Sequence, residues 1–211
     1  MKSVRAISQC LGTTGVRPVL ACLVMGAALV GGCAPQRKPT PATPRAGVTL
    51  EQMRTARSLA QQAQREAIAG HTEEAIELYR QALQTWNRVE TAWNNLGKLL
   101  QEQGNFAAAA EAFQVAADQS PGDPRPVENL GVLWAQRGYH DEALTQFDEA
   151  LRRDPRSIVA LRGAVRSAHM LQLADEDTLE HIKKALMLET DPTWLKYLER
   201  QRYRVEQELN Y

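Results

Sequence analysis

The chain contains 211 residues, of which 44% are apolar and 24% are charged, and its formal net charge at pH 7 is zero. A chain of this length and composition fits one soluble domain accompanied by processing segments. Because the charges balance, the composition gives no electrostatic reason to expect a nucleic-acid partner.

Residues 1–32 differ in kind from the rest of the chain. Three basic residues near the start carry the only charges of this segment, and a short apolar run extends from Val19 to Val30. That run is shorter than the roughly 20 residues that a bilayer core requires. A basic start, a short apolar run and an exit of small residues are typical of a secretory signal peptide, so we expect an exported protein.

The exit of this segment reads Val30-Gly31-Gly32-Cys33 and resembles the lipobox of bacterial lipoproteins. The resemblance implies cleavage before Cys33 and attachment of acyl chains to its sulfur and its new amino group. Cys33 is also the only cysteine left after cleavage, and lipidation explains an unpaired cysteine in an exported protein. Ala34 follows it, in place of the Asp that retains lipoproteins in the inner membrane of enteric bacteria. The resemblance therefore implies an outer-membrane anchor facing the periplasm.

Residues 33–48 predict a linker between the lipid and the folded part. Four prolines lie in this segment, and it has no large apolar residue before Val48, so it cannot form a core. We expect a semi-rigid spacer of about 3.1 Å per residue, or roughly 40 Å at full extension.

Two copies of a 34-residue pattern occupy residues 90–123 and 124–157. Seven identities recur at this offset: Leu96, Gly97, Gly104, Ala109, Phe113, Ala116 and Pro121 return as Leu130, Gly131, Gly138, Ala143, Phe147, Ala150 and Pro155. A fixed period of this kind predicts helix pairs that stack into a solenoid and bury their apolar faces on their neighbours. The residue types and their order resemble the tetratricopeptide repeat.

Each recurring residue has a physical role in such a helix pair. Gly97 and Ala109 lack bulk where the two helices come closest, and Gly104 adopts the left-handed conformation that ends the first helix. Phe113 fills the space between successive pairs. Pro121 prevents the second helix from continuing.

A diverged copy precedes the two strong ones, over residues 49–89. Ala63, Gly70 and Tyr79 lie 34 residues before their counterparts in the first strong copy. Thr49, followed by Gln52, predicts a capping box at the start of its first helix.

A second diverged copy covers residues 158–191, and a final segment covers residues 192–211. No glycine occupies the turn of this copy near Leu173, and Asp175 is the predicted N-cap of its second helix. The final segment predicts an amphipathic capping helix, because the last repeat must present one face to water.

The resemblance to tetratricopeptide repeats implies an all-α, right-handed solenoid of four helix pairs and a C-terminal capping helix. It further implies that the first helices of the pairs line a concave groove for a protein partner. The groove-facing positions are then Asn94, Asn95, Lys98, Asn129, Arg162 and Arg166.

The amides among these residues can bracket a peptide backbone, and the cations can pair with carboxylates. The set loosely resembles the dicarboxylate clamp of chaperone-binding tetratricopeptide domains, although Ala60 and Gln64 stand where that clamp has its first Lys and Asn. The alternative interpretation is that these residues are ordinary polar side chains of helix surfaces.

No motif in the sequence indicates catalysis, a cofactor or a metal. The four histidines show no metal-ligand spacing, and the sequence has no nucleophile elbow, no P-loop and no dinucleotide fingerprint. We therefore expect a protein that is not an enzyme and has no catalytic residues, cofactor or metal site.

These features together predict a membrane-anchored scaffold of the bacterial cell envelope that binds a client peptide or helix. Among lipoproteins of this build, the resemblance is strongest to those of pilus and secretin assembly. Two alternatives stay open: an accessory subunit of a cell-wall enzyme, and a periplasmic chaperone for outer-membrane proteins.

Overall fold

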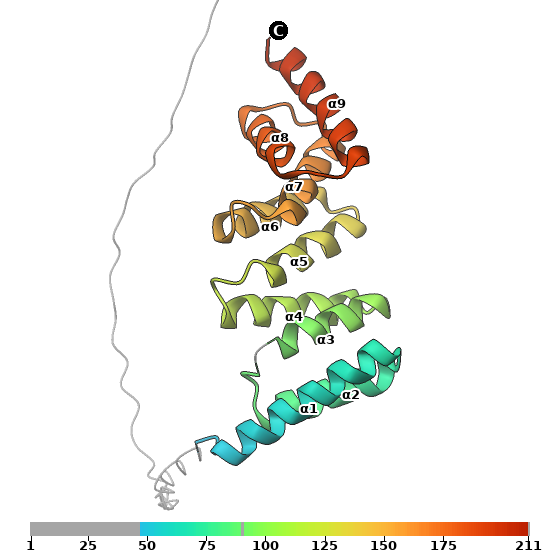
Figure 1. Ribbon diagram of the computed structural model, residues 1–211, viewed down its shortest axis with the longest axis vertical. Coiled ribbons are helices and arrows are strands. Elements are labelled where there is room, and N and C mark those ends of the chain that lie inside the picture. Colours follow the sequence, from blue (N-terminus) through green and yellow to red (C-terminus); the bar gives the residue numbers. More distant parts are fainter. Residues whose placement is uncertain (1–46, 90, 211) are drawn as a thin grey trace, which may run out of the picture. The chain divides into compact units, whose positions relative to one another are not determined.

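The computed structural model describes residues 47–89 and 91–210 of the chain. Within these residues the fold is entirely helical, with nine helices and no strand, which confirms the predicted all-α class (Figure 1). The helices are α1 (Leu50–Ala69), α2 (Thr72–Thr85), α3 (Ala92–Glu102), α4 (Phe106–Gln119), α5 (Arg125–Gln136), α6 (His140–Arg153), α7 (Ile158–Met170), α8 (Glu176–Leu188) and α9 (Pro192–Leu209).

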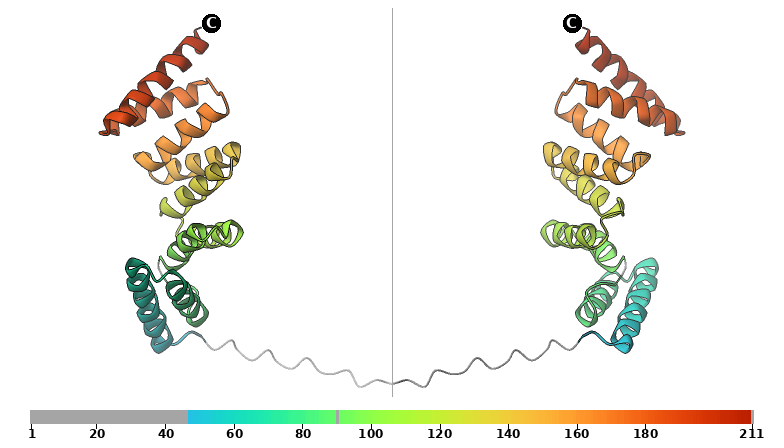
Figure 2. Two further views of the ribbon diagram at one scale, coloured as in Figure 1. Left: turned by 90° about the vertical axis from the view of Figure 1, so that its right-hand side faces the viewer. Right: turned by 90° about the vertical axis from the view of Figure 1, so that its left-hand side faces the viewer.

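The helices form an array in which each one packs on its neighbours in the sequence (Figure 1 and Figure 2). The odd-numbered helices also contact one another: α3 lies against α1 and α5, and α7 lies against α5 and α9. Among the described residues, no two even-numbered helices make such contacts. Because packing is closer along the odd-numbered side, α1, α3, α5 and α7 line the concave face of the array.

Two helix starts confirm the capping signals of the sequence. At α1 the Thr49 hydroxyl accepts from the Gln52 N–H (3.1 Å), and the Gln52 side chain accepts from the Thr49 N–H (2.8 Å). At α8 the Asp175 carboxylate accepts from the Thr178 N–H (2.8 Å). These caps supply hydrogen-bond acceptors for backbone N–H groups in the first turn, which have no acceptor within the helix.

The turns within the pairs depend on a left-handed residue. Gly70, Gly104 and Gly138 follow the first helices of the first three pairs with φ of 84°, 78° and 82°, as predicted for Gly104 and Gly138. The fourth pair has no glycine there, and Gln172 takes the same conformation with φ of 58°. A residue with a Cβ is strained in this region by about 1–2 kcal/mol.

The phenylalanines of the central pairs pack directly on glycines of the first helices. Phe113 and Phe147 are fully buried. A Cβ added at Gly97 would lie 2.6 Å from the Phe113 ring, and one added at Gly131 would lie 2.7 Å from the Phe147 ring. The glycines are therefore required by the close approach of the two helices of a pair.

The array ends at α9, which packs on α8 and α7. Leu198 and Val205 of α9 are fully buried against Leu161 and Ile182, while Tyr203 on the opposite side is exposed. A terminal helix of a solenoid requires one apolar face that packs on the array and one face that is exposed to solvent.

None of the described helices is long and apolar enough to cross a membrane. The predicted signal peptide, Cys33 and nearly all of the predicted linker fall within residues 1–46, outside the described residues.

Candidate protein-binding groove

All six residues predicted to face the groove lie on first helices of the pairs. Asn94, Asn95 and Lys98 belong to α3, Asn129 belongs to α5, and Arg162 and Arg166 belong to α7. The six do not form one cluster, because their side chains take part in different contacts.

The three amides are bonded within the protein. The Asn95 Nδ2 donates to the Tyr79 hydroxyl (3.1 Å), and the Asn129 Nδ2 donates to the Asn94 Oδ1 (2.8 Å). Burial raises the pKa of Tyr79, and the hydrogen bond from Asn95 opposes that rise. These amides connect neighbouring pairs, so a peptide would have to compete with existing bonds or use the acceptor sites that remain.

Lys98 is exposed and has no hydrogen bond or ion pair to any described residue. It lines a hollow of about 260 Å³ between α1 and α3, together with Gln64, Tyr79, Asn95 and Glu102. A free ammonium beside polar side chains suits the carboxylate or backbone carbonyl of a bound segment.

Arg162 is held by an internal carboxylate. Its Nε and Nη2 donate to the two oxygens of Glu189, both at 2.6 Å, and the guanidinium lies 4.9 Å from the centre of the Trp194 ring. The Glu189 side chain is 1% exposed and also accepts from the N–H groups of Thr190 and Asp191, each at 2.8 Å.

These donors, the Arg162 guanidinium first, hold the pKa of Glu189 at about 2. The bidentate pair joins α7 to the segment that leads into α9. Arg162 is thus a structural residue that holds the capping helix against α7. Its position in the repeat did not predict this role.

Arg166 differs from Arg162 because it is exposed and has no ion pair among the described residues. It lines a cavity of about 540 Å³ on the concave face between α5, α6 and α7. The apolar residues Val132, Phe147 and Met170 form much of its wall. A cavity of this size with few polar groups is within the range of ligand sites.

Sequence reasoning missed the residues that give this cavity its shape. Gly163 lies 34 residues after Asn129 and 68 after Asn95, so it replaces an amide of the preceding repeats. That replacement is visible in the sequence and signals the cavity. Ser167 and His140, which also line it, carry no comparable signal.

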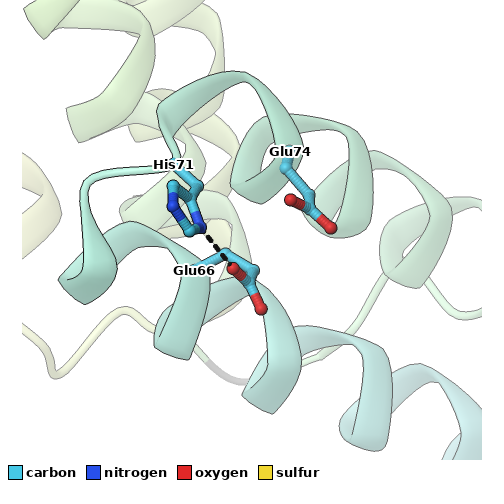
Figure 3. Close-up of side chains that lie close together, drawn as sticks. All are labelled: Glu66, His71 and Glu74. Carbon is cyan, nitrogen blue, oxygen red and sulfur yellow. Dashed lines mark hydrogen bonds and ion pairs between the residues drawn. The ribbon is translucent and has the colours of Figure 1, made fainter.

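A cluster outside the groove brings three possible metal ligands together at the turn between α1 and α2 (Figure 3). One ligand atom each from Glu66, His71 and Glu74 lies within 4.8 Å of the others. The His71 Nδ1 is 2.8 Å from a Glu66 oxygen, and this bond raises the pKa of His71. The bond between Glu66 and His71 links the end of α1 to the turn before α2, and this link accounts for the position of the two side chains. The spacing of the three residues along the sequence matches no known metal-binding motif.

Comparison with known proteins finds family matches in two stretches of the chain. Residues 54–124 match one tetratricopeptide repeat profile, and residues 128–153 match another. A search of the curated proteins finds no significant match.

The solved structures that resemble this one share its fold at low identity. A crystal structure of MamA is 20% identical with a TM-score of 0.59, over 63% of this chain and 77% of that chain. MamA 41-end from Desulfovibrio magneticus RS-1 is 17% identical with a TM-score of 0.56, over 63% and 75%. The first TPR of Spaghetti (RPAP3) bound to HSP90 peptide SRMEEVD is 16% identical with a TM-score of 0.55, over 57% and 96%.

The family matches and the nine stacked helices agree with the 34-residue period of the sequence. The stretches 54–124 and 128–153 thus match tetratricopeptide repeat models, and the described helices share the fold of the solved structures above.

Proposed function

We propose that this chain is a lipid-anchored scaffold of the bacterial cell envelope that captures a segment of a client protein on its concave face. The observation that carries the binding role is the pair of hollows on that face, each lined by an exposed cation that bonds to no described residue, Lys98 and Arg166. Cations that are not engaged in an ion pair with any described residue fit a segment that carries acidic residues, and this holds most clearly at Arg166, whose cavity has no acidic residue in its described lining, whereas Glu102 lines the hollow at Lys98.

The anchoring role is supported by the sequence of residues 1–48. The lipobox-like Val30-Gly31-Gly32-Cys33 and the proline-rich linker match a lipid anchor with a spacer. Two or more acyl chains, at about 0.8 kcal/mol per buried methylene, anchor a protein stably where one chain does not. Confinement at a membrane raises the effective concentration of a client that is bound to the same membrane.

Within the envelope we propose a role in pilus or secretin assembly at the outer membrane, since the resemblance to lipoproteins of that build is the closest. The mechanism is simple. The lipid fixes the protein, the linker extends its reach, and the groove holds one segment of the client while the rest assembles.

One observation favours the alternative of an accessory subunit that binds through another face. Between α2, α3 and α4 lies a cavity of about 330 Å³ with the apolar floor Leu83, Leu96 and Leu100. Arg80 and Glu111 line it as well. This surface suits a protruding apolar side chain of a folded partner.

Fractionation of cells tests the anchor. Wild-type protein is expected to sediment with membranes and to incorporate labelled fatty acid, whereas Cys33→Ser is expected to remain in the soluble periplasmic fraction without label. A Cys33→Ser protein that still sediments with outer membranes contradicts the lipid anchor.

Crosslinking in cells tests the groove. A photoreactive residue at position 98 on the concave face and one at position 80 on the other face are compared. Crosslinks to a discrete protein from position 98 alone support the concave face. Crosslinks from position 80 alone support the accessory-subunit alternative and contradict the groove.

A further inference from the structure

We infer that the cavity between α5, α6 and α7 is a specificity pocket for an apolar side chain of the client, with Arg166 pairing to an aspartate or glutamate next to it. The inference rests on the proposed capture of a client segment and specifies its chemistry. Four observations carry it: the floor of the cavity, its unpartnered polar atoms, its charge and its length.

The floor exists because position 163 has no side chain. A Cβ added at Gly163 would overlap the Phe147 ring, so the ring lies between Gly131 of its own pair and Gly163 of the next. At the equivalent positions of the preceding repeats, Asn95 and Asn129 carry amides that bond to neighbours. The fourth pair thus presents an aromatic ring where the others present an amide.

Two polar atoms at the cavity have no partner within the described residues. The Ser167 Oγ and the His140 Nδ1 are buried and make no hydrogen bond, and Ser167 is only 1% exposed. Buried polar groups in proteins are nearly always paired, and an orphan lowers stability. Both residues line the cavity, so a bound segment could supply their missing partners through its backbone amide groups.

The charge of the cavity is positive. Arg162 and Arg166 line it, and no acidic residue does. Glu189 neutralises Arg162 through the bidentate pair, whereas Arg166 forms no ion pair with any residue that the structure describes. An acidic side chain beside the apolar one therefore finds a matching charge, whereas a basic residue there would be repelled.

The length of the cavity along α7 suits a short extended segment. Val159 and Met170 line the cavity and are 47% and 57% exposed. Eleven residues of helix separate them, about 16 Å at 1.5 Å per residue. At about 3.3 Å per extended residue, roughly five residues of a client span this distance, so the apolar and the acidic side chain fit within one short stretch.

Selection from a random dodecapeptide library displayed without a free C-terminus, on the full-length protein in detergent, tests the inference. Enriched peptides are expected to place an apolar residue within two positions of Asp or Glu. Synthetic amidated copies are then measured by fluorescence anisotropy. We expect Met170→Glu to weaken their binding at least 10-fold and Arg166→Gln about 5-fold, while Met187→Glu, an exposed methionine of α8 outside the cavity, has no effect.

Ser167→Ala separates binding from folding. Because the hydroxyl bonds to no described residue, its removal is expected to leave the melting temperature unchanged or higher. It should nevertheless weaken peptide binding about 3- to 10-fold. A variant that loses stability and binding together contradicts the assignment of this hydroxyl to the ligand.

The other outcomes are also decisive. The proposed pocket is contradicted if the enriched peptides lack the apolar–acidic pair. It is also contradicted if they bind Met170→Glu as tightly as the wild type. If such peptides respond instead to Lys98→Glu, the pocket fails while the proposed capture on the concave face stands. If no peptide is enriched, both the pocket and the proposed capture of extended segments are overturned.

Discussion

The two central helix pairs and the fourth pair with its cap use equivalent positions in opposite ways. In the central pairs, Asn95 and Asn129 bond to residues of adjacent helices, and the turn is made by glycine. In the fourth pair, glycine replaces the amide at position 163, and Gln172 makes the turn with a strained backbone.

This difference between the central pairs and the fourth pair indicates where a repeat array has groups available to a ligand. The consensus positions of the central pairs satisfy one another, so they stabilise the stack and leave few free groups. The departure at Gly163 in the fourth pair opens a cavity lined by Arg166 and Ser167, and neither side chain bonds to a described residue. Lys98, at the position in a central pair that is equivalent to Arg166, also has no such bond. Groups such as Arg166 and Ser167 beside Gly163 can therefore bond to a ligand without giving up a bond within the described part of the protein.

The largest expected effect on stability follows from substitution of Phe147, whose ring packs against both the third and the fourth helix pair. Phe147→Ala should lower the free energy of unfolding by about 3–5 kcal/mol, because it removes a fully buried ring from the contact with Gly131 and Gly163. Phe113→Ala, its counterpart in the preceding pair, should have a similar effect. Urea unfolding followed by circular dichroism measures both.

The comparison predicts a further difference between these two variants. Only Phe147→Ala removes the floor of the cavity, so only it should alter peptide binding beyond its effect on stability. Equal changes in binding for both phenylalanines, measured under conditions where both variants remain folded, would remove the distinction between the two regions.

The next largest effect on stability concerns the ion pair between Arg162 and Glu189, which joins α7 to the segment before the capping helix α9. Glu189→Ala should cost about 2–4 kcal/mol, because it leaves Arg162 without its bidentate partner and two backbone N–H groups without their acceptor. Hydrogen exchange should accelerate in α9 and α7 and stay unchanged in α1 and α2. Uniform acceleration along the chain would show that the pair does not act locally.

The same pair makes part of the stability depend on pH. Because the Arg162 guanidinium and the backbone donors hold the pKa of Glu189 at about 2, below its ordinary value of 4.5, the stabilisation is complete above that ordinary value. It is lost as the pH falls toward 2. The difference in unfolding free energy between wild type and Glu189→Gln should be constant from pH 7 to 5 and should shrink below pH 4.5.

The smallest expected effects are at the turns. Gly138→Gln should lower stability by about 1 kcal/mol, since φ is 82° there and a side chain meets strain although nothing crowds it. Gln172→Gly should raise stability by up to about 1 kcal/mol by relieving strain at φ of 58°. Opposite shifts in melting temperature support the comparison, and shifts of the same sign contradict it.

The sequence by itself determined the architecture of this protein. The 34-residue period, the turn glycines and the capping residues at Thr49 and Asp175 predicted an all-helical stack that the structure contains. This was possible because repeats, caps and turns are local: each depends on residues within one or two helical turns or on an exact period.

Only the tertiary structure decided what the six predicted groove residues do. It shows the three amides bonded within the protein and Arg162 bonded to Glu189 far along the chain, while Lys98 and Arg166 bond to none of the residues in 47–89 and 91–210. Partnership between side chains depends on how helices meet in space, and no periodicity encodes a pair 27 residues apart. The period therefore predicts which helix surface faces the groove, and tertiary contacts decide which of its groups remain available to a ligand.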